Sequence, residues 1–293
     1  FWDCGEYIVS SAKLGVTHAP GAALYQLIGA VWAGLAFGDS SKYAVLINSM
    51  SAITSAATIM FLFWTITHLA RRMFFVTKPN ELIDNAYSTA LSKSQALIVL
   101  GSGIVGSMAF MFSDSFWFSA AEGEVYAMAS LFTAILIWMG CKWEEESDKE
   151  RANKWLLLIS LFIGLATGVH LMAILAIPAV CYMYYAKNYK FTVKSFIIAN
   201  IITAAFLGFV FKFLFGAVMT FFGKTEIYVV NNFGLPFNSG TFIAAVILVL
   251  AFYLGVKYTK KYNWKLGNTL VLSIAFMLIG FSCWLVIPIR ANA

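Results

Sequence analysis

Long apolar runs separated by short polar stretches fill most of this sequence. Several runs reach the roughly 20 residues that a helix needs to cross the hydrocarbon core of a bilayer. The sequence lacks the segments of about ten residues with alternating polarity that form membrane β-barrels. We therefore predict an all-α integral membrane protein, a polytopic helical bundle. The predicted spans are residues 43–70, 94–112, 125–141, 155–186, 195–222, 240–256 and 266–288.

The run at 155–186 is too long for one ordinary membrane helix. It contains Gly164, Gly168 and Pro178, which are residue types that interrupt helices. We expect this run to divide near Gly168–His170, into two short helices or one broken helix.

The composition agrees with a membrane protein, because 61% of the residues are hydrophobic and only 12% are charged, against about 25% charged in soluble domains. The sequence carries no nucleotide-binding, zinc-protease or cysteine-cluster motif. We expect no metal, no required cofactor and no nucleic-acid partner. The chain opens on Phe1 and stops directly after an apolar run. We expect 1–293 to be a single membrane domain from a longer protein, without that protein's first transmembrane helix and C-terminal region.

The basic residues indicate which ends of the spans face the same side. Most of the 20 Lys and Arg lie in four segments, which the positive-inside rule assigns to the cytoplasm. These segments are 71–93, 142–154, 187–194 and 257–265. The opposite, non-cytoplasmic side then holds 1–20, 38–42, 113–124, 223–239 and 289–293, where acidic residues outnumber basic ones. Loop 142–154 also carries acidic residues, but these count little in the rule.

Segment 21–37 is apolar, yet a crossing there would place Arg71 and Arg72 on the outer side. We therefore expect it to form an interfacial helix in the first outer loop, lying on or dipping into the membrane surface.

The first outer segment gathers chemically active side chains: Trp2, Asp3, Glu6 and His18. Asp3 and Glu6 are three residues apart, so one helical turn places both carboxylates on one face. Partial desolvation beside Trp2 and Tyr7 would raise a carboxylate pKa toward values useful for a general base. The alternative is a solvated acidic pair in an outer loop with an incidental His.

The second outer segment, 112–126, combines carboxylates, serines and aromatic rings, a composition suited to binding a sugar by stacking and hydrogen bonding. The alternative is an interfacial aromatic belt, with acids that favour the dipole of the next helix. The candidate binding residues here are Asp114, Trp117, Glu122 and Glu124.

Three further ionisable residues lie in or beside apolar runs. His170 stands near the break in 155–186, and ionisable groups at membrane depth usually face a cavity or partner. Lys212 and Arg290 lie toward the outer ends of their spans, where a cation suits a phosphate. The alternatives are a His satisfied by a backbone carbonyl and two snorkelling anchors.

Four ordered motifs carry a resemblance to a known family. They are Phe1-Trp2-Asp3-Cys4-Gly5-Glu6, His18-x-Pro20-Gly21, Ser113-Asp114-Ser115-Phe116-Trp117 with Glu122-Gly123-Glu124-Val125-Tyr126-Ala127, and Gly168-Val169-His170-Leu171. Together they resemble the transmembrane protein 260-like protein O-mannosyltransferases, whose bacterial relatives form domain of unknown function 2723. The resemblance tapers after residue 186.

That resemblance implies the GT-C superfamily, membrane enzymes that use a polyprenyl-phosphate sugar and carry an acidic residue in the first outer loop. It makes Asp3 the candidate general base and Glu6 its neighbour. Two departures stand out. Ala19 replaces a usual Pro, and neither Ala22 nor Ala23 supplies the Lys that other GT-C mannosyltransferases carry after the Pro-Gly turn. Phosphate binding is therefore expected elsewhere.

We expect an inverting glycosyltransferase that moves a hexose, most simply mannose, from a polyprenyl-phosphate donor to Ser/Thr hydroxyls of exported proteins. The active face would be periplasmic in a bacterium and lumenal in the endoplasmic reticulum of a eukaryote. Two alternatives stay open. One is a transporter or flippase for lipid-linked sugars, and the other is a non-catalytic membrane subunit.

Overall fold

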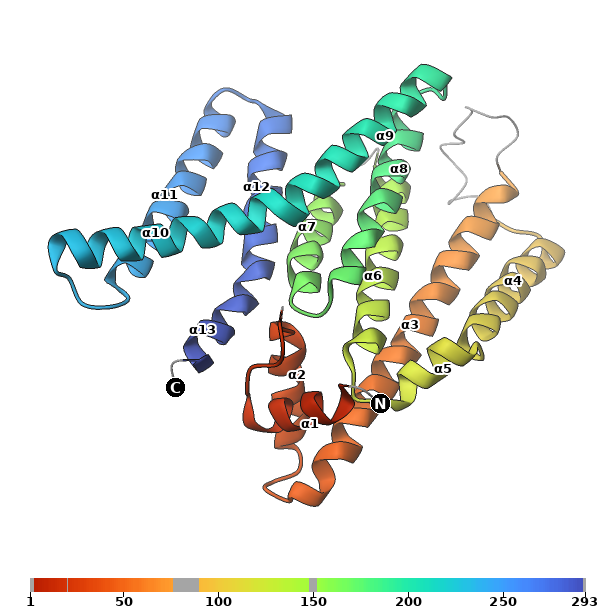
Figure 1. The fold of residues 1–293 in the computed structure, drawn as a ribbon. Helices are drawn as coiled ribbons and strands as arrows, with labels where there is room; N and C mark the ends of the chain where they lie inside the picture. The colour runs from red at the N-terminus through yellow and green to blue at the C-terminus, as the bar shows by residue number, and fades with distance from the viewer. Residues whose placement is uncertain (1–2, 20, 76–89, 148–151, 292–293) are drawn as a thin grey trace.

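The computed structural model describes residues 3–19, 21–75, 90–147 and 152–291. Every regular element in these ranges is helical, and the helices form a polytopic bundle (Figure 1). The chain is therefore an all-α membrane protein, as the apolar runs predict.

Six of the predicted spans are confirmed as helices long and apolar enough to cross a membrane. Each coincides with one apolar run, because a bilayer core leaves no partner other than the helix itself for backbone polar groups. The six candidate spans are Ser40–Met73, Lys93–Met111, Val125–Glu146, Val193–Phe233, Ser239–Lys261 and Lys265–Arg290. They contain α3 (Tyr43–Met73), α4 (Lys93–Met111), α6 (Val125–Glu146), α9 (Val193–Gly208), α10 (Phe215–Phe233), α11 (Ser239–Lys261) and α12 (Lys265–Phe281).

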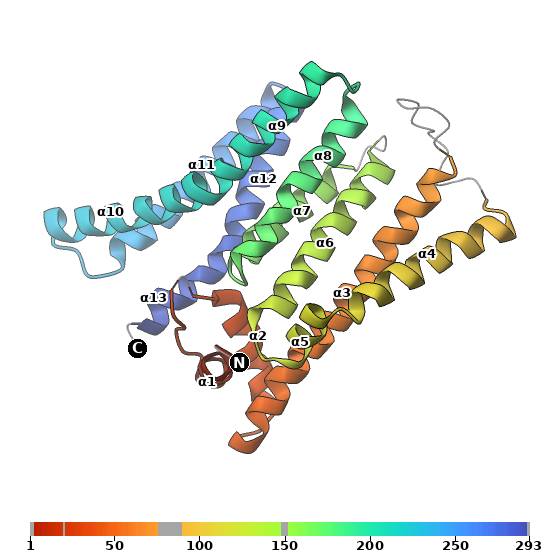
Figure 2. The ribbon, with the colours of Figure 1, turned by 45° about the vertical axis from the view of Figure 1, so that its right-hand side comes forward.

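The predicted break in 155–186 is confirmed. Helix α7 (Asn153–Thr167) ends before Gly168, the 3₁₀-helix η2 (Leu171–Ala176) follows, and α8 (Ile177–Asn188) runs back. At about 1.5 Å per residue α7 is only ~22 Å long, which is shorter than the ~30 Å bilayer core. Figure 2 shows α7 and α8 running in opposite directions beside α6.

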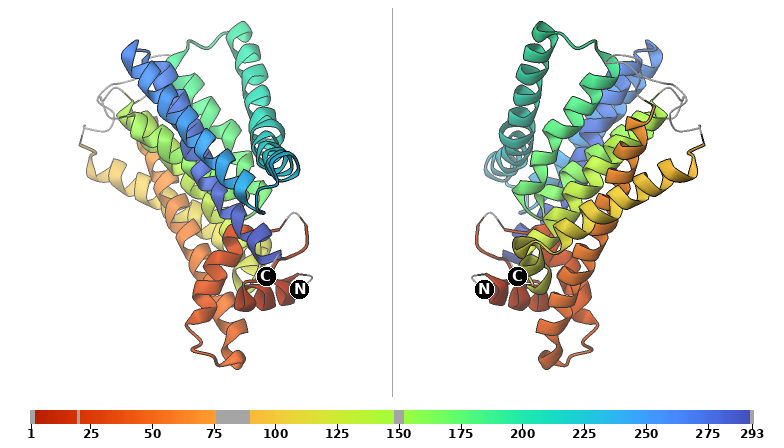
Figure 3. Two further views of the ribbon diagram at one scale, coloured as in Figure 1. Left: turned by 90° about the vertical axis from the view of Figure 1, so that its left-hand side faces the viewer. Right: turned by 90° about the vertical axis from the view of Figure 1, so that its right-hand side faces the viewer.

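The connecting segments separate into two ends, as the charge pattern predicts. Helix ends at Met73, Glu146, Asn188 and Lys261 lie at the upper end of Figure 1. The lower end carries the short helices that precede or follow spans, and Figure 3 shows them gathered there. They are α1 (Cys4–Lys13), α2 (Ala23–Gly34), η1 (Ser40–Lys42), α5 (Asp114–Ala121), η4 (Ser282–Leu285) and α13 (Val286–Ala291).

The helix that begins at Val193 is longer than the predicted span 195–222. It continues through a π-helical segment, η3 (Phe209–Leu214), into α10 and ends only at Phe233. Its 41 residues would extend ~62 Å, about twice the bilayer core. Figure 1 accordingly shows α10 running across α12 rather than beside it. Most of segment 223–239 is therefore helix, not loop.

Small residues let α7 and α12 pack backbone to backbone. A side chain at Gly164 would collide with the Met277 carbonyl, and one at Gly280 would collide with the Leu161 carbonyl. Ser160, Gly164 and Gly168 recur every four residues, the small-xxx-small spacing of closely packed membrane helices.

Helix α2 packs into the lower end of the bundle. Tyr25 is fully buried, and the Leu24 amide donates to the Gly168 carbonyl at 2.7 Å. The 12 residues of α2 span only ~18 Å, too short to cross the bilayer core. Its place relative to the membrane surface stays a prediction.

Candidate functional site

The candidate site begins at the first turn of α1. Asp3 is the residue that precedes the helix, and Glu6 lies in its first turn. The side chain of His18 returns to the same place, so that ligand atoms of Asp3, Glu6 and His18 all lie within 4.8 Å of one another. The predicted clustering of these three residues is thus present in the fold.

A tight reversal after α1 brings His18 back over the helix. Leu14 adopts a left-handed backbone conformation with φ 48°, and the Gly15 amide donates to the Ser10 carbonyl at 2.7 Å. This arrangement is a common way to end a helix. A second turn follows, in which the Gly21 amide donates to the His18 carbonyl at 2.8 Å. Gly21 has φ 87°, a conformation open to glycine.

Glu6 and His18 hold each other directly. The His18 amide donates to Glu6 Oε1 at 2.6 Å, and His18 Nδ1 lies 2.9 Å from Glu6 Oε2. The side-chain hydrogen bond from His18, with its backbone hydrogen bond, lowers the pKa of Glu6 below 4.5. The same side-chain hydrogen bond raises the pKa of His18 above 6.5. Both side chains are exposed, so solvent screens the pair.

Asp3 also faces the second acidic segment. It lines an open cavity of about 720 Å³ at the lower end of the bundle. The two outer segments, far apart in sequence, therefore form one site. The cavity is lined by Asp3, Asp114, Ser115, Phe118, Ser119, Glu122, Glu124 and Tyr126.

Gly123 fixes the two glutamates of this cavity against α3. A side chain at Gly123 would come within 2.8 Å of Ile47 and 2.9 Å of Asn48, so only glycine allows the close approach. Glu122 and Glu124, on either side of it, are each only 8% exposed. Burial raises the pKa of Glu124, opposed by a backbone hydrogen bond from Asp3 and reinforced by the charges of Glu122 and Asp3.

His170 approaches the cavity through Tyr126, a lining residue. The two rings lie 5.3 Å apart between centroids. His170 Nδ1 accepts a hydrogen bond from the Met172 amide at 3.1 Å, so a neutral His170 carries its proton on Nε2. His170 thus caps the start of η2 and also borders the site.

Tyr126 belongs to the second predicted segment but was not among the predicted binding residues, and the structure places it in the cavity lining. Tyr7 was not among the predicted site residues either, beyond helping to desolvate the carboxylates, and its ring packs edge-on against His18 at 6.1 Å. Burial, with the charges of Asp3, Glu124 and Glu6, raises the pKa of Tyr7 to about 12. The signal for both was their position inside or directly after the acidic motifs.

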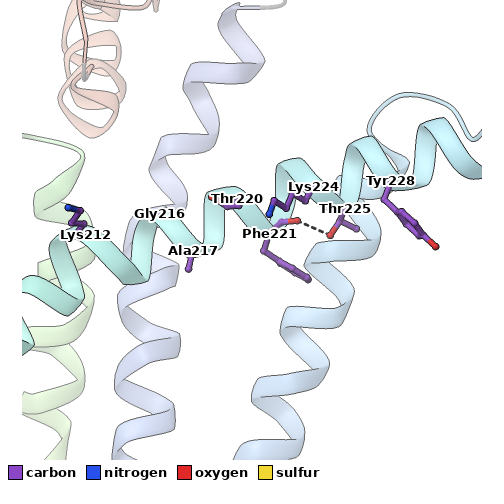
Figure 4. Close-up of a pocket in the computed structure, with 8 residues that line it drawn as sticks. All are labelled: Lys212, Gly216, Ala217, Thr220, Phe221, Lys224, Thr225 and Tyr228. Atoms are coloured by element: carbon purple, nitrogen blue, oxygen red, sulfur yellow. Dashed lines mark hydrogen bonds between the residues drawn. The ribbon is translucent and has the colours of Figure 1, made fainter.

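Other predicted residues lie apart from the cavity. Trp117 stacks on Phe112 at 5.8 Å and is not among the lining residues. Lys212 lines a separate groove on α10 (Figure 4). Trp2 lies outside the described residues.

Arg290 meets the other end of α1. Its Nε donates to the Leu14 carbonyl at 2.8 Å, and a terminal nitrogen lies 3.3 Å from the Lys13 carbonyl. These contacts tie α13 to the loop that carries His18.

The geometry offers one carboxylate pair with an imidazole, next to a cavity rich in further carboxylates and hydroxyls. Asp3, Glu6 and His18 are also a donor set that a divalent cation accepts. Proton removal from a hydroxyl and hydrogen bonding to a polyol are chemistry that this arrangement supports without such an ion.

A family model, the protein O-mannosyl-transferase TMEM260 N-terminal domain, matches residues 3–193. The chain is 22% identical over 219 residues to protein O-mannosyl-transferase tmem260 of Dictyostelium discoideum, covering 70% of this chain and 23% of that relative. It is 25% identical over 164 residues to protein O-mannosyl-transferase TMEM260 of Mus musculus, covering 56% of this chain and 19% of the relative. No solved structure matches. The chain thus spans about a fifth to a quarter of the length of these curated relatives.

The matched region starts at Asp3 and reaches the first residue of α9. It contains both acidic segments and His170, and it covers more than half of the chain. This chain therefore belongs to the family of the protein O-mannosyl-transferase TMEM260 N-terminal domain.

Proposed function

We propose that the protein is a GT-C type glycosyltransferase, which moves a hexose, most simply mannose, from a polyprenyl-phosphate donor to Ser/Thr hydroxyls of exported proteins. The observation that carries this proposal is the cavity that joins Asp3 to Asp114, Glu122 and Glu124 at one end of the bundle. The names of the relatives supply the reaction class. The acceptor would arrive from the periplasm or the lumen of the endoplasmic reticulum.

In the proposed reaction Asp3 acts as general base. It takes the proton of the acceptor hydroxyl while the hydroxyl oxygen bonds to the anomeric carbon from the face opposite the phosphate. The bond between that carbon and the phosphate oxygen breaks, and its electron pair leaves on the polyprenyl phosphate. The sugar passes through oxocarbenium character and its configuration inverts, as in base-assisted glycosyl chemistry. This scheme requires no metal or other cofactor.

The remaining residues have positioning and binding roles in this proposal. Glu6 holds His18 beside Asp3 through the two hydrogen bonds between them. Glu122 and Glu124 hydrogen-bond sugar hydroxyls, and Asp114, which lines the same cavity, binds the sugar as well. Arg290 stabilises the departing phosphate, because its guanidinium already borders the first outer loop. Lys212, which lies in a different groove, is the second candidate for that role.

The transfer assay uses the purified membrane protein, a polyprenyl-phosphate hexose with a labelled sugar, and a Ser/Thr-containing acceptor. We expect covalent label on the acceptor hydroxyl, and none when a nucleotide sugar replaces the lipid donor. Mass spectrometry of exported proteins from cells with and without the gene then identifies the sugar and its acceptors.

Each alternative function has its own outcome. Movement of a lipid-linked sugar across liposomes, with no covalent transfer, would identify a flippase. Full cellular glycosylation after Asp3, Glu6 and Asp114 are all neutralised would identify a non-catalytic subunit.

A further inference from the structure

A second groove lies on α10, apart from the catalytic cavity. It has a volume of about 680 Å³, and its lining residues follow η3 and α10 (Figure 4). Its lining residues are Lys212, Gly216, Ala217, Thr220, Phe221, Lys224, Thr225 and Tyr228, none of which lines the cavity at Asp3. It is therefore a separate candidate site.

Thr220 and the two lysines of the groove lie along one row of the helix surface. Thr220 and Lys224 are four residues apart, so their side chains lie on neighbouring turns of one face. Lys212, eight residues before Thr220, continues the same row of side chains, which winds gradually around the helix. Gly216 lies on the same row, and a side chain there would meet only open space. Because Gly216 has no side chain, the helix surface is lower between Lys212 and Thr220.

These polar groups lack protein partners. Within the described part of the chain, no carboxylate forms an ion pair with either lysine, and the Thr220 hydroxyl forms no hydrogen bond. Thr225 differs, because its hydroxyl donates to the Phe221 carbonyl at 2.7 Å, the dashed line in Figure 4. Ammonium groups and a threonine hydroxyl can all donate hydrogen bonds to an anion.

The surroundings indicate that the anion belongs to a lipid. The exposed neighbours on η3 and α10 are large and apolar: Phe211, Met219 and Ile227 are 52%, 48% and 63% exposed. Side chains of this kind fit acyl or prenyl chains. The continuous helix Val193–Phe233 is also too long to stand upright in a bilayer, so we expect α10 to run obliquely, near the depth of the lipid phosphates.

The local backbone supplies a further, independent observation. Lys212 lies within the π-helical segment η3, and π-helical turns occur frequently at functional sites.

We propose that this groove binds the phosphate of an anionic membrane lipid, through Lys224 and Thr220, with Lys212 at its other end. The two lysines are twelve residues apart, or ~18 Å along the helix, so a single phosphate contacts Lys224 and Thr220 while Lys212 attracts the lipid to the groove. Binding of polyprenyl phosphate at this groove rests on the proposed function, in which Lys212 is the second candidate for the donor phosphate, whereas binding of phosphatidylglycerol does not.

The test is lipid titration of the purified protein in detergent, monitored by native mass spectrometry. Phosphatidylglycerol and polyprenyl phosphate are titrated separately, with phosphatidylcholine and inorganic phosphate as comparison ligands. We expect Lys224→Gln to weaken anionic-lipid binding about fivefold, which corresponds to ~1 kcal/mol for one lysine near a membrane surface. Thr220→Val, which changes no charge, is expected to weaken it several-fold.

Matched controls are Lys257→Gln and Lys260→Gln, two exposed lysines near the end of α11. The proposal holds if the groove variants lose affinity and the α11 variants do not. A loss confined to phosphatidylglycerol or to polyprenyl phosphate identifies which lipid is bound. Three results would overturn the proposal. They are equal losses of lipid affinity in the groove and α11 variants, no loss in either set, and inorganic phosphate binding as tightly as the anionic lipids.

Discussion

At the residue scale, the His18–Glu6 pair is the feature of the site with the clearest electrostatic consequence. The pair makes one short side-chain contact and one backbone hydrogen bond. The folded pKa of His18 is raised, so its contribution to stability is complete below 6.5 and is lost as pH rises through the folded pKa. The folded pKa of Glu6 is lowered, so its contribution is complete above 4.5 and is lost as pH falls through the folded pKa. Both contributions are therefore complete between pH 4.5 and 6.5.

This pairing predicts a change in the titration of His18. In Glu6→Gln the charged partner is absent, so the pKa of His18 should fall toward 6.5. NMR titration of the imidazole measures it directly. Asp39→Asn is the matched control, because Asp39 pairs with Lys42 elsewhere. A His18 pKa that is the same in Glu6→Gln and wild type would contradict the pairing.

Sequence reasoning identified the chemical groups of the site better than their contacts. Asp3, Glu6 and His18 are close in the chain, so helical spacing and one turn place them together. The meeting of Asp3 with Glu124 depends on the folding of 120 intervening residues and on the close approach of Gly123 to α3. Trp117 shows where residue type alone is not enough. An indole ring suits stacking on a sugar, but here it packs on Phe112.

At the scale of elements, the small-residue contact between α7 and α12 has a mutational consequence. Gly164→Ala places a methyl group against the Met277 carbonyl, and overpacking of this kind costs about 1–3 kcal/mol. Thermal unfolding in detergent should show that loss. Gly101→Ala on α4 is the control, because a side chain there meets nothing within 4 Å. Equal stability of the two variants would show that the helices do not pack this closely.

A buried ion pair joins α3 to α6 at the opposite end of the bundle. Arg72 pairs with Glu144, whose side chain is only 5% exposed. Arg72→Met leaves this carboxylate without its partner, which we expect to cost roughly 3 kcal/mol of unfolding free energy. The double variant Arg72→Met/Glu144→Leu should recover most of that loss in chemical denaturation. A double variant as unstable as the single one would contradict the pairing.

Element boundaries were predictable where polarity changed abruptly, and not where a helix continued through polar residues. The predicted span ended at 222 because Lys224 and Glu226 follow it. The helix continues because Glu226 accepts hydrogen bonds from the Asn238 and Thr241 amides at the start of α11, at 2.6 and 2.7 Å. Such a long-range use of a carboxylate leaves no periodic signal in the sequence.

At the scale of the whole molecule, the charge pattern and the fold agree on two opposite ends. The positive-inside rule then predicts sidedness. A cysteine introduced at Ser41 should react with an impermeant maleimide added from the outer side, and one at Asn188 should react only after the membrane is permeabilised. The experiment begins from a variant with Cys4, Cys141, Cys181 and Cys283 replaced. The reverse pattern would invert the topology and place Asp3 on the cytoplasmic side.

The proposed function depends most on Asp3 as the general base of a sugar transfer. The most direct measurement is hexose transfer from a polyprenyl-phosphate donor by Asp3→Asn, which keeps the size of the side chain and removes its basicity. Loss of a general base predicts a fall in turnover of about 100-fold or more. Asp39→Asn, an exposed carboxylate at the same end of the bundle, should retain normal turnover. Near-normal turnover by a folded Asp3→Asn protein would contradict the account.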